Sequence, residues 1–132
     1  MISLHHPHLM ASDLDATVAF WENGFGGRVV DDIEFAGARN VFMRIGEGRL
    51  HLYEQAPKST ARSAIHHLGV QTDELDALVE RLRGMGTSVT DVREQPGARY
   101  AMAEGPDGLL IELFEPDADQ MSSGMREHFH GL

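Results

Sequence analysis

Hydrophobic and polar positions follow two similar patterns along the chain, one in each half. In the first half, residues 4–11 alternate as a strand does, and Ser12 is expected to be the N-cap of a helix. Apolar residues then recur on one face of that helix, at Leu14, Val18, Trp21 and Phe25, and the glycines of residues 24–27 predict its end. Short strands should follow at 28–35, 39–45 and 49–54, which gives the order βαβββ.

The second half repeats this order. A strand is expected at residues 65–72, Asp73 is the expected N-cap, and the helix is marked at i, i+3, i+4 and i+7 by Leu75, Leu78, Val79 and Leu82. The strands that follow are expected at 88–93, 99–103 and 109–114. Residues 57–63 are small, polar and proline-containing, as in a surface linker, and residues 117–132 should form a short helix or a mobile tail. The sequence therefore predicts an α+β protein made of two tandem βαβββ modules.

Composition narrows the classes of function. The chain has 132 residues, which suits one domain, and its formal charge of −10 argues against binding to nucleic acid. Cysteine is absent, so only imidazole and carboxylate groups remain for metal binding or nucleophilic chemistry. The chain also contains neither a signal-like start nor an apolar run of about 18 residues, so we expect a cytoplasmic protein outside the membrane.

Four residues that bind metals well recur at one interval. His67 follows His6 by 61 residues, and Glu112 follows His51 by the same interval. Strand alternation puts His51 and Glu112 on the other face of their strands from the apolar residues that flank them. With the same alternation at His6 and His67, all four side chains should point away from the helices. The sequence therefore predicts a metal site between equivalent positions of the two modules. The neighbouring His5 and His66 should face the helices as structural histidines.

Three segments resemble the vicinal oxygen chelate superfamily of glyoxalases, bleomycin-resistance proteins and extradiol dioxygenases: HHPHLMASDLDATVAFW, IHHLGVQTDELDALVERL and EGPDGLLIELFEP. The resemblance implies one glyoxalase-like domain, residues 1–116, in which modules 1–56 and 64–116 form an incomplete barrel around a divalent metal. It also implies a homodimer, because the barrel of short members is commonly completed across two chains.

The resemblance assigns the metal ligands residue by residue. His6, His67 and Glu112 match the family's ligands, whereas His51 occupies the position that is usually Glu in glyoxalase I and Gln in methylmalonyl-CoA epimerase. The metal is one divalent ion, Ni, Co, Zn, Mn or Fe. Fosfomycin-resistance enzymes also fit the length, but their additional polar and cationic residues are not found in GARYAMAEGPDG.

The activity depends on whether His51 coordinates. With His51 as a fourth ligand, two adjacent positions of an octahedral ion remain for two vicinal oxygens of a small substrate. A glyoxalase-type lyase or isomerase, acting through a metal-bound enediolate, is then expected, with Glu112 as the first candidate for the base and His51 as the second. With His51 off the metal, the remaining triad suits an Fe(II)-dependent, extradiol-type dioxygenase. A metal-free, drug-sequestering resistance protein is the third hypothesis.

Other residues on the predicted strands are candidates for contacting a ligand or the substrate: His8, Arg44, Tyr53, Tyr100 and Met102. His8 is a candidate hydrogen-bond partner, proton shuttle or alternative ligand. Arg44 and Arg99 would suit a carboxylate or phosphate, unless they are ordinary arginines on an exposed strand face. His128 and His130 are either a fortuitous pair in the tail or part of a lid.

Overall fold

The computed structural model describes residues 1–2, 4–59, 64–129 and 131. It divides into two compact units, Met1–Ala61 and Arg62–Leu132. The first unit contains β1 (His8–Ala11), α1 (Leu14–Phe25), β2 (Arg28–Phe35), β3 (Ala38–Ile45) and β4 (Gly48–Glu54). The second contains β5 (Leu68–Gln71), α2 (Leu75–Gly84), β6 (Arg93–Gln95), β7 (Ala98–Glu104) and β8 (Leu110–Pro116). The predicted α+β class and the two βαβββ modules are confirmed.

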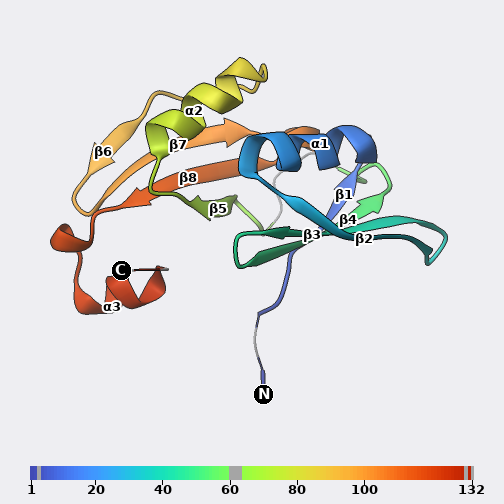
Figure 1. Ribbon diagram of the computed structural model, residues 1–132, viewed down its shortest axis with the longest axis horizontal. Coiled ribbons are helices and arrows are strands. Elements are labelled where there is room, and N and C mark those ends of the chain that lie inside the picture. The colour runs from blue at the N-terminus through green and yellow to red at the C-terminus, as the bar shows by residue number, and fades with distance from the viewer. Residues whose placement is uncertain (3, 60–63, 130, 132) are drawn as a thin grey trace. The chain divides into compact units, whose positions relative to one another are not determined.

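In the first unit, α1 lies across one face of a four-stranded sheet of order β1-β4-β3-β2 (Figure 1). Strand β1 runs parallel to β4, and the other neighbours are antiparallel. The core between α1 and the sheet includes the fully buried Trp21, Met43 and Leu52. The N-cap of α1 is Asp13, whose side chain accepts a hydrogen bond from Ala16 N–H, so the expectation that Ser12 would be the cap is wrong.

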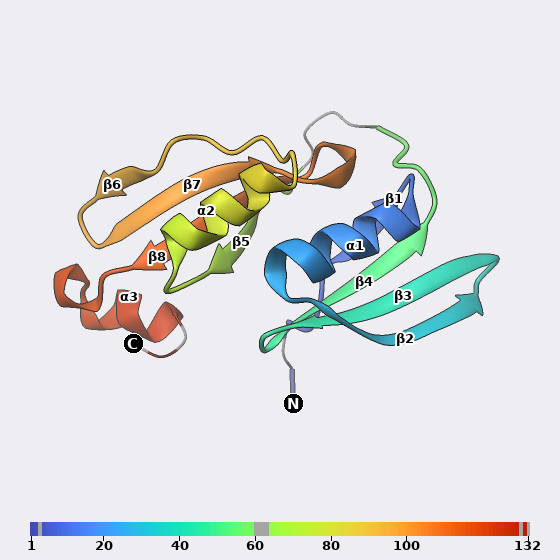
Figure 2. The ribbon, with the colours of Figure 1, turned by 45° about the horizontal axis from the view of Figure 1, so that its top comes forward.

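The second unit has the same plan, with α2 on a sheet of order β5-β8-β7-β6 (Figure 2). Its core includes Leu82, Ile111 and Leu113, each with no exposed surface. The start of α2 differs from the prediction, because its N-cap is Glu74, whose side chain makes no cap bond, rather than Asp73. A carboxylate from β8 takes over that role, since Glu115 Oε2 accepts a hydrogen bond from Leu75 N–H at 2.8 Å.

Three predicted strands differ from the observed ones by more than two residues at one end. The first strands of the modules begin at His8 and Leu68 rather than at residues 4 and 65. Proline has no N–H to donate to a ladder, and the β1–β4 pairing accordingly begins at Pro7, whose carbonyl accepts from His51 N–H. The strand predicted at 88–93 is reduced to an isolated bridge at Val89, with β6 beginning only at Arg93, and the Arg83 guanidinium donates to the carbonyls of Val89 and Thr90.

The C-terminal segment contains two short helices, η2 (Ala118–Gln120) and α3 (Ser123–His128), and a further 3-10 turn, η1 (Pro106–Gly108), precedes β8. Phe129, which follows α3, stacks on Phe114 of β8 with ring centroids 4.9 Å apart. The segment therefore folds back on its own sheet. Among the described residues, no helix has both the length and the apolar character that crossing a membrane requires.

Candidate metal centre

His51 lies on β4 with its ring held on three sides. Leu50 and Leu52 are buried, so alternation turns His51 to the opposite face of the sheet, as predicted. His8 on β1 and Phe42 on β3 are its partners in register. His8 stacks on one side of the imidazole at 3.9 Å between centroids, and Phe42 stacks at 4.3 Å. The ring therefore has little rotational freedom.

Asn40 fixes the tautomer of His51. Its side chain is 1% exposed, and its amide nitrogen donates to the carbonyls of Phe35 and Ala38 at 2.9 and 3.0 Å. Both N–H groups are thus in use, so the atom that faces His51 Nε2 at 2.6 Å is the acceptor Oδ1. His51 Nε2 must therefore carry the proton, and the lone pair of the neutral ring lies on Nδ1.

The surroundings also keep His51 neutral. Burial lowers the pKa of His51 below its ordinary value, and the nearby His8 and His6 lower it further. The imidazole therefore offers a lone pair, rather than a positive charge, at neutral pH. This lone pair can accept a proton or bind a metal, and in either role it acts through Nδ1.

His6 lies just ahead of β1 and close to His51, with their ring centroids 5.8 Å apart. The Nδ1 atoms of His5 and His6 lie 2.7 Å apart, and those of His66 and His67 lie 2.8 Å apart. The doublet thus has the same geometry in both units. The expectation that His5 and His66 face the helices is wrong, since both are exposed and pair with the next histidine.

The second unit brings together one imidazole and one carboxylate. His67 Nε2 lies 3.2 Å from Glu112 Oε2, and both side chains are half-buried. Ile111 and Leu113, which flank Glu112, point into the core, so Glu112 faces away from α2 as predicted. Neighbouring ligands that each lie about 2.1 Å from one ion are about 3 Å apart, which fits this pair. Imidazole and carboxylate are also donors that Zn, Mn, Fe, Co and Ni accept.

The four predicted ligands thus form one pair in each unit, His6 with His51 and His67 with Glu112. The part of the chain that the structure describes has no group of three or more candidate ligands within either unit. The four-ligand metal centre remains a prediction.

The other predicted site residues have distinct surroundings. Tyr53 donates its hydroxyl to the carbonyl of Ala36 at 3.0 Å, so that group is already engaged. Met102 is the register partner of Glu112, and Tyr100 is the partner of Phe114, which puts both on the Glu112 face of their sheet. Arg99 is paired with Asp76 and Glu115. These ion pairs support the alternative of an ordinary strand arginine over that of one that holds a ligand.

Two further observations concern residues that the sequence left open or did not single out. His128 is exposed on α3 with its ring edge against Phe129, and His130 lies outside the described residues. Asn40 was not predicted as part of the site. A polar residue amid the apolar positions of β3 was the available signal, but only the cross-strand register brings it to His51.

The family model of the Glyoxalase/Bleomycin resistance protein/Dioxygenase superfamily matches residues 3–113. The chain belongs to this superfamily. The resemblance to vicinal oxygen chelate proteins is thereby confirmed, and the match spans both modules and all four predicted ligands.

Two known proteins are similar to this chain over nearly their whole length. The uncharacterized protein YwbC of Bacillus subtilis is 26% identical over 121 residues, which cover 85% of this chain and 96% of YwbC. FosX, a fosfomycin resistance protein of Listeria monocytogenes, is 25% identical with a TM-score of 0.76, over 91% of this chain and 98% of FosX. A variant of that FosX, 24% identical, was solved with Mn(II) and 1S,2S-dihydroxypropylphosphonic acid.

A structure with a different role has a similar fold. TnmS3, an antibiotic binding protein from Streptomyces sp. CB03234, is 24% identical with a TM-score of 0.75, over 89% of this chain and 98% of TnmS3. Structures of this fold therefore include one solved with Mn(II) and one described as an antibiotic binding protein.

Proposed function

We propose that this chain is a divalent-metal-dependent enzyme that moves a proton between neighbouring carbons of a small substrate with two vicinal oxygens, as a glyoxalase-type isomerase or lyase. His6, His67 and Glu112 would hold the metal, and His51 would be the base. The observation that carries the metal-dependent part is the convergence of His67 Nε2 and Glu112 Oε2 at 3.2 Å. The Mn(II) in the FosX variant supports a metal in this fold.

His51 suits the role of base because Asn40 holds the proton on Nε2. The Nδ1 lone pair is then free to accept a proton from a substrate carbon and to return it to the carbon beside it. His8 and Phe42 keep the ring in one plane during both transfers. Glu112, our first candidate from the sequence, is less suited because it is paired with His67.

A bound divalent ion would supply Lewis-acid stabilisation of the negative charge that develops on the two substrate oxygens. Phe42 contributes in a different way. It covers one side of the His51 imidazole, which limits the access of water to a proton that the ring has taken up.

An Fe(II)-dependent dioxygenase is the second candidate function. The pairing of His67 with Glu112 supports it as well, because with His51 off the metal these two and His6 make a triad of two histidines and one carboxylate. The two enzymes differ in the metal they require and in the use of O₂.

Elemental analysis of the protein purified without chelator, and again after adding Mn, Ni, Co, Zn or Fe(II), tests the proposal. We expect roughly stoichiometric metal in the wild type and in His51→Ala, and loss of the metal in His67→Ala and Glu112→Gln. His128→Ala is the matched control, since it removes an exposed histidine of the same unit. A wild type that retains and regains no metal would refute both enzyme functions and favour a binding protein like TnmS3.

Proton transfer is tested with hydroxyacetone, a minimal compound with vicinal oxygens. We expect the metal-loaded wild type to exchange its methylene protons for solvent deuterium, which NMR detects, and His51→Ala to lose this exchange while it keeps its metal. Bound iron with O₂ uptake on catechol, and no deuterium exchange, would support the dioxygenase instead.

A further inference from the structure

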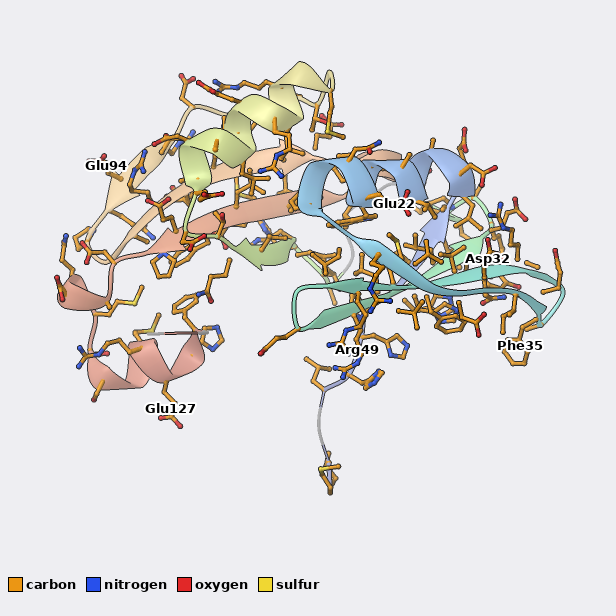
Figure 3. All side chains as sticks on the ribbon, in the orientation of Figure 1. Glu22, Asp32, Phe35, Arg49, Glu94 and Glu127 are labelled. Atoms are coloured by element: carbon orange, nitrogen blue, oxygen red, sulfur yellow. The ribbon has the colours of Figure 1, made fainter. Side chains whose placement is uncertain are left out.

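Three arginines occupy neighbouring register positions on adjacent strands of the first unit. Arg28 of β2 is the partner of Arg44 of β3, and Arg44 is also the partner of Arg49 of β4. We call these residues the arginine row. Arg49 lies two residues before His51 on β4, so it shares the His51 face of the sheet. Figure 3 shows Arg49 on the side of the sheet away from α1.

The arginine row carries positive charge that the protein does not neutralise. Like charges directly opposite each other on neighbouring strands are destabilising. The printed sequence has 21 acidic residues against 11 basic ones, yet no ion pair among the described residues includes a member of the row. Asp31 is the register partner of Phe42, and its side chain accepts a hydrogen bond from Asp32 N–H instead.

Other arginines of this chain do have acidic partners. Arg39 contacts Asp15 and Asp32 at 2.7 Å, and Arg99 contacts Asp76 and Glu115 at 2.8 and 2.9 Å. Arg81, Arg93 and Arg126 also form no ion pair among the described residues, so what distinguishes the row is that its three arginines lie side by side in register. Because the cost of the repulsion would be relieved by an external anion, the row has the character of an anion site.

The row also leads toward the candidate metal ligands. His8 is the parallel partner of His51, so His6, two residues earlier, lies at the level of Arg49, two residues before His51. At this level, the residues that lie side by side across the sheet are thus, in spatial order, Arg28, Arg44, Arg49 and His6. Two residues along a strand span about 7 Å, a distance that an arginine side chain can cover. An anion held by the row would lie beside any ligand that His6 and His51 contact.

We infer that the arginine row binds the oxyanion group of the substrate, a phosphate, phosphonate or carboxylate, next to the vicinal oxygens. Guanidinium groups bind such oxyanions through two parallel hydrogen bonds, which also fixes the orientation of the bound molecule. The assignment of the anion to the substrate rests on the proposed function. The anion site itself does not, because none of its residues is a candidate metal ligand.

Calorimetric titration of metal-free protein, treated with EDTA and dialysed into a buffer without phosphate, tests the site. Inorganic phosphate and acetate are the two probes, and the one that binds more tightly identifies the phosphoryl or the carboxylate class. We expect saturable binding to the wild type and at least about tenfold weaker binding to Arg44→Gln and Arg49→Gln. Arg93→Gln, which removes an exposed arginine of β6, is the matched control and should bind as the wild type does.

Thermal denaturation of the same proteins gives a second readout. We expect phosphate or acetate to raise the Tm of the wild type and of Arg93→Gln, and to raise that of Arg49→Gln much less at the same concentration. Arg49 is exposed, so this variant should fold even if the half-buried Arg44 proves necessary for stability.

Binding of neither anion to the wild type, or equal binding to Arg49→Gln, would overturn the inference. Because the titration uses metal-free protein, it can fail while the metal content stays stoichiometric, and the proposed function can fail while the titration succeeds.

Discussion

Asn40 is the buried polar residue through which the β2–β3 hairpin holds His51. Replacing it in Asn40→Ala removes two donated hydrogen bonds, to Phe35 and Ala38, and the bond accepted from His51. A hydrogen bond contributes about 1 kcal/mol net, so we expect a loss of about 3 kcal/mol in the free energy of unfolding. For a chain of this size that corresponds to a fall in Tm of about 10 °C.

The assay is thermal and urea denaturation followed by circular dichroism. Asn23→Ala is the matched control, because Asn23 is exposed on α1 and alanine is a better helix former. It should change the free energy of unfolding by less than about 0.5 kcal/mol. A double-mutant cycle of Asn40→Ala with His51→Ala isolates the shared bond, and we expect a coupling energy of about 1 kcal/mol.

Long-range ¹H–¹⁵N NMR of the histidine rings tests the tautomer directly. In the wild type, His51 should show a protonated Nε2 and an unprotonated Nδ1, whereas in Asn40→Ala both tautomers become accessible because the acceptor is gone. A wild-type His51 with its proton on Nδ1, or a coupling energy near zero, would refute the reasoning that Asn40 orients the ring.

Three further predictions concern stability. Glu115→Ala should lower the free energy of unfolding by about 1–2 kcal/mol in urea denaturation, because the Leu75 N–H at the start of α2 loses its acceptor on β8. Glu115→Gln should cost less. Gly27→Ala should cost about 1–3 kcal/mol, since its Cβ would lie 2.8 Å from a carbonyl oxygen of α1, whereas Gly84→Ala, with nothing within 4 Å, should be neutral or stabilising. Arg39 holds the pKa of the Asp32 carboxyl below its ordinary value of 3.8. The ion pair between the two therefore stabilises the fold above pH 3.8, and this contribution is lost as the pH falls below that value. Asp32→Asn should flatten the pH dependence of Tm in this range.

The sequence predicted best those features that depend on local alternation. Strand β2 has the expected bounds, and the faces of β4 and β8 follow from buried leucine and isoleucine at every second position. Residues 4–7 misled the prediction because they alternate like a strand although Pro7 cannot donate to a ladder. Asn40 and the arginine row escaped it for a common reason. Their neighbours are set by cross-strand register, which depends on turn lengths and on the irregularity between Val29 and Asp31.

The two modules keep the same strands but surround equivalent positions differently. Glu112 has Gly69 as its register partner on β5, which leaves space on that side, and Met102 on the other. A carboxylate with an open flank is free to pair with His67, as the 3.2 Å contact shows. Such a carboxylate suits a metal ligand.

His51, at the equivalent position of the first module, is instead enclosed. His8 stands where the second module has Gly69, and Phe42 stands where it has Met102. Two stacked rings and the amide of Asn40 leave this imidazole one usable atom, Nδ1, and one orientation. A ring fixed in this way can act only through that atom, which suits it to the proposed role of taking up and returning a proton. The difference between the halves is therefore the one expected if duplication left a ligand in the second module and a base in the first.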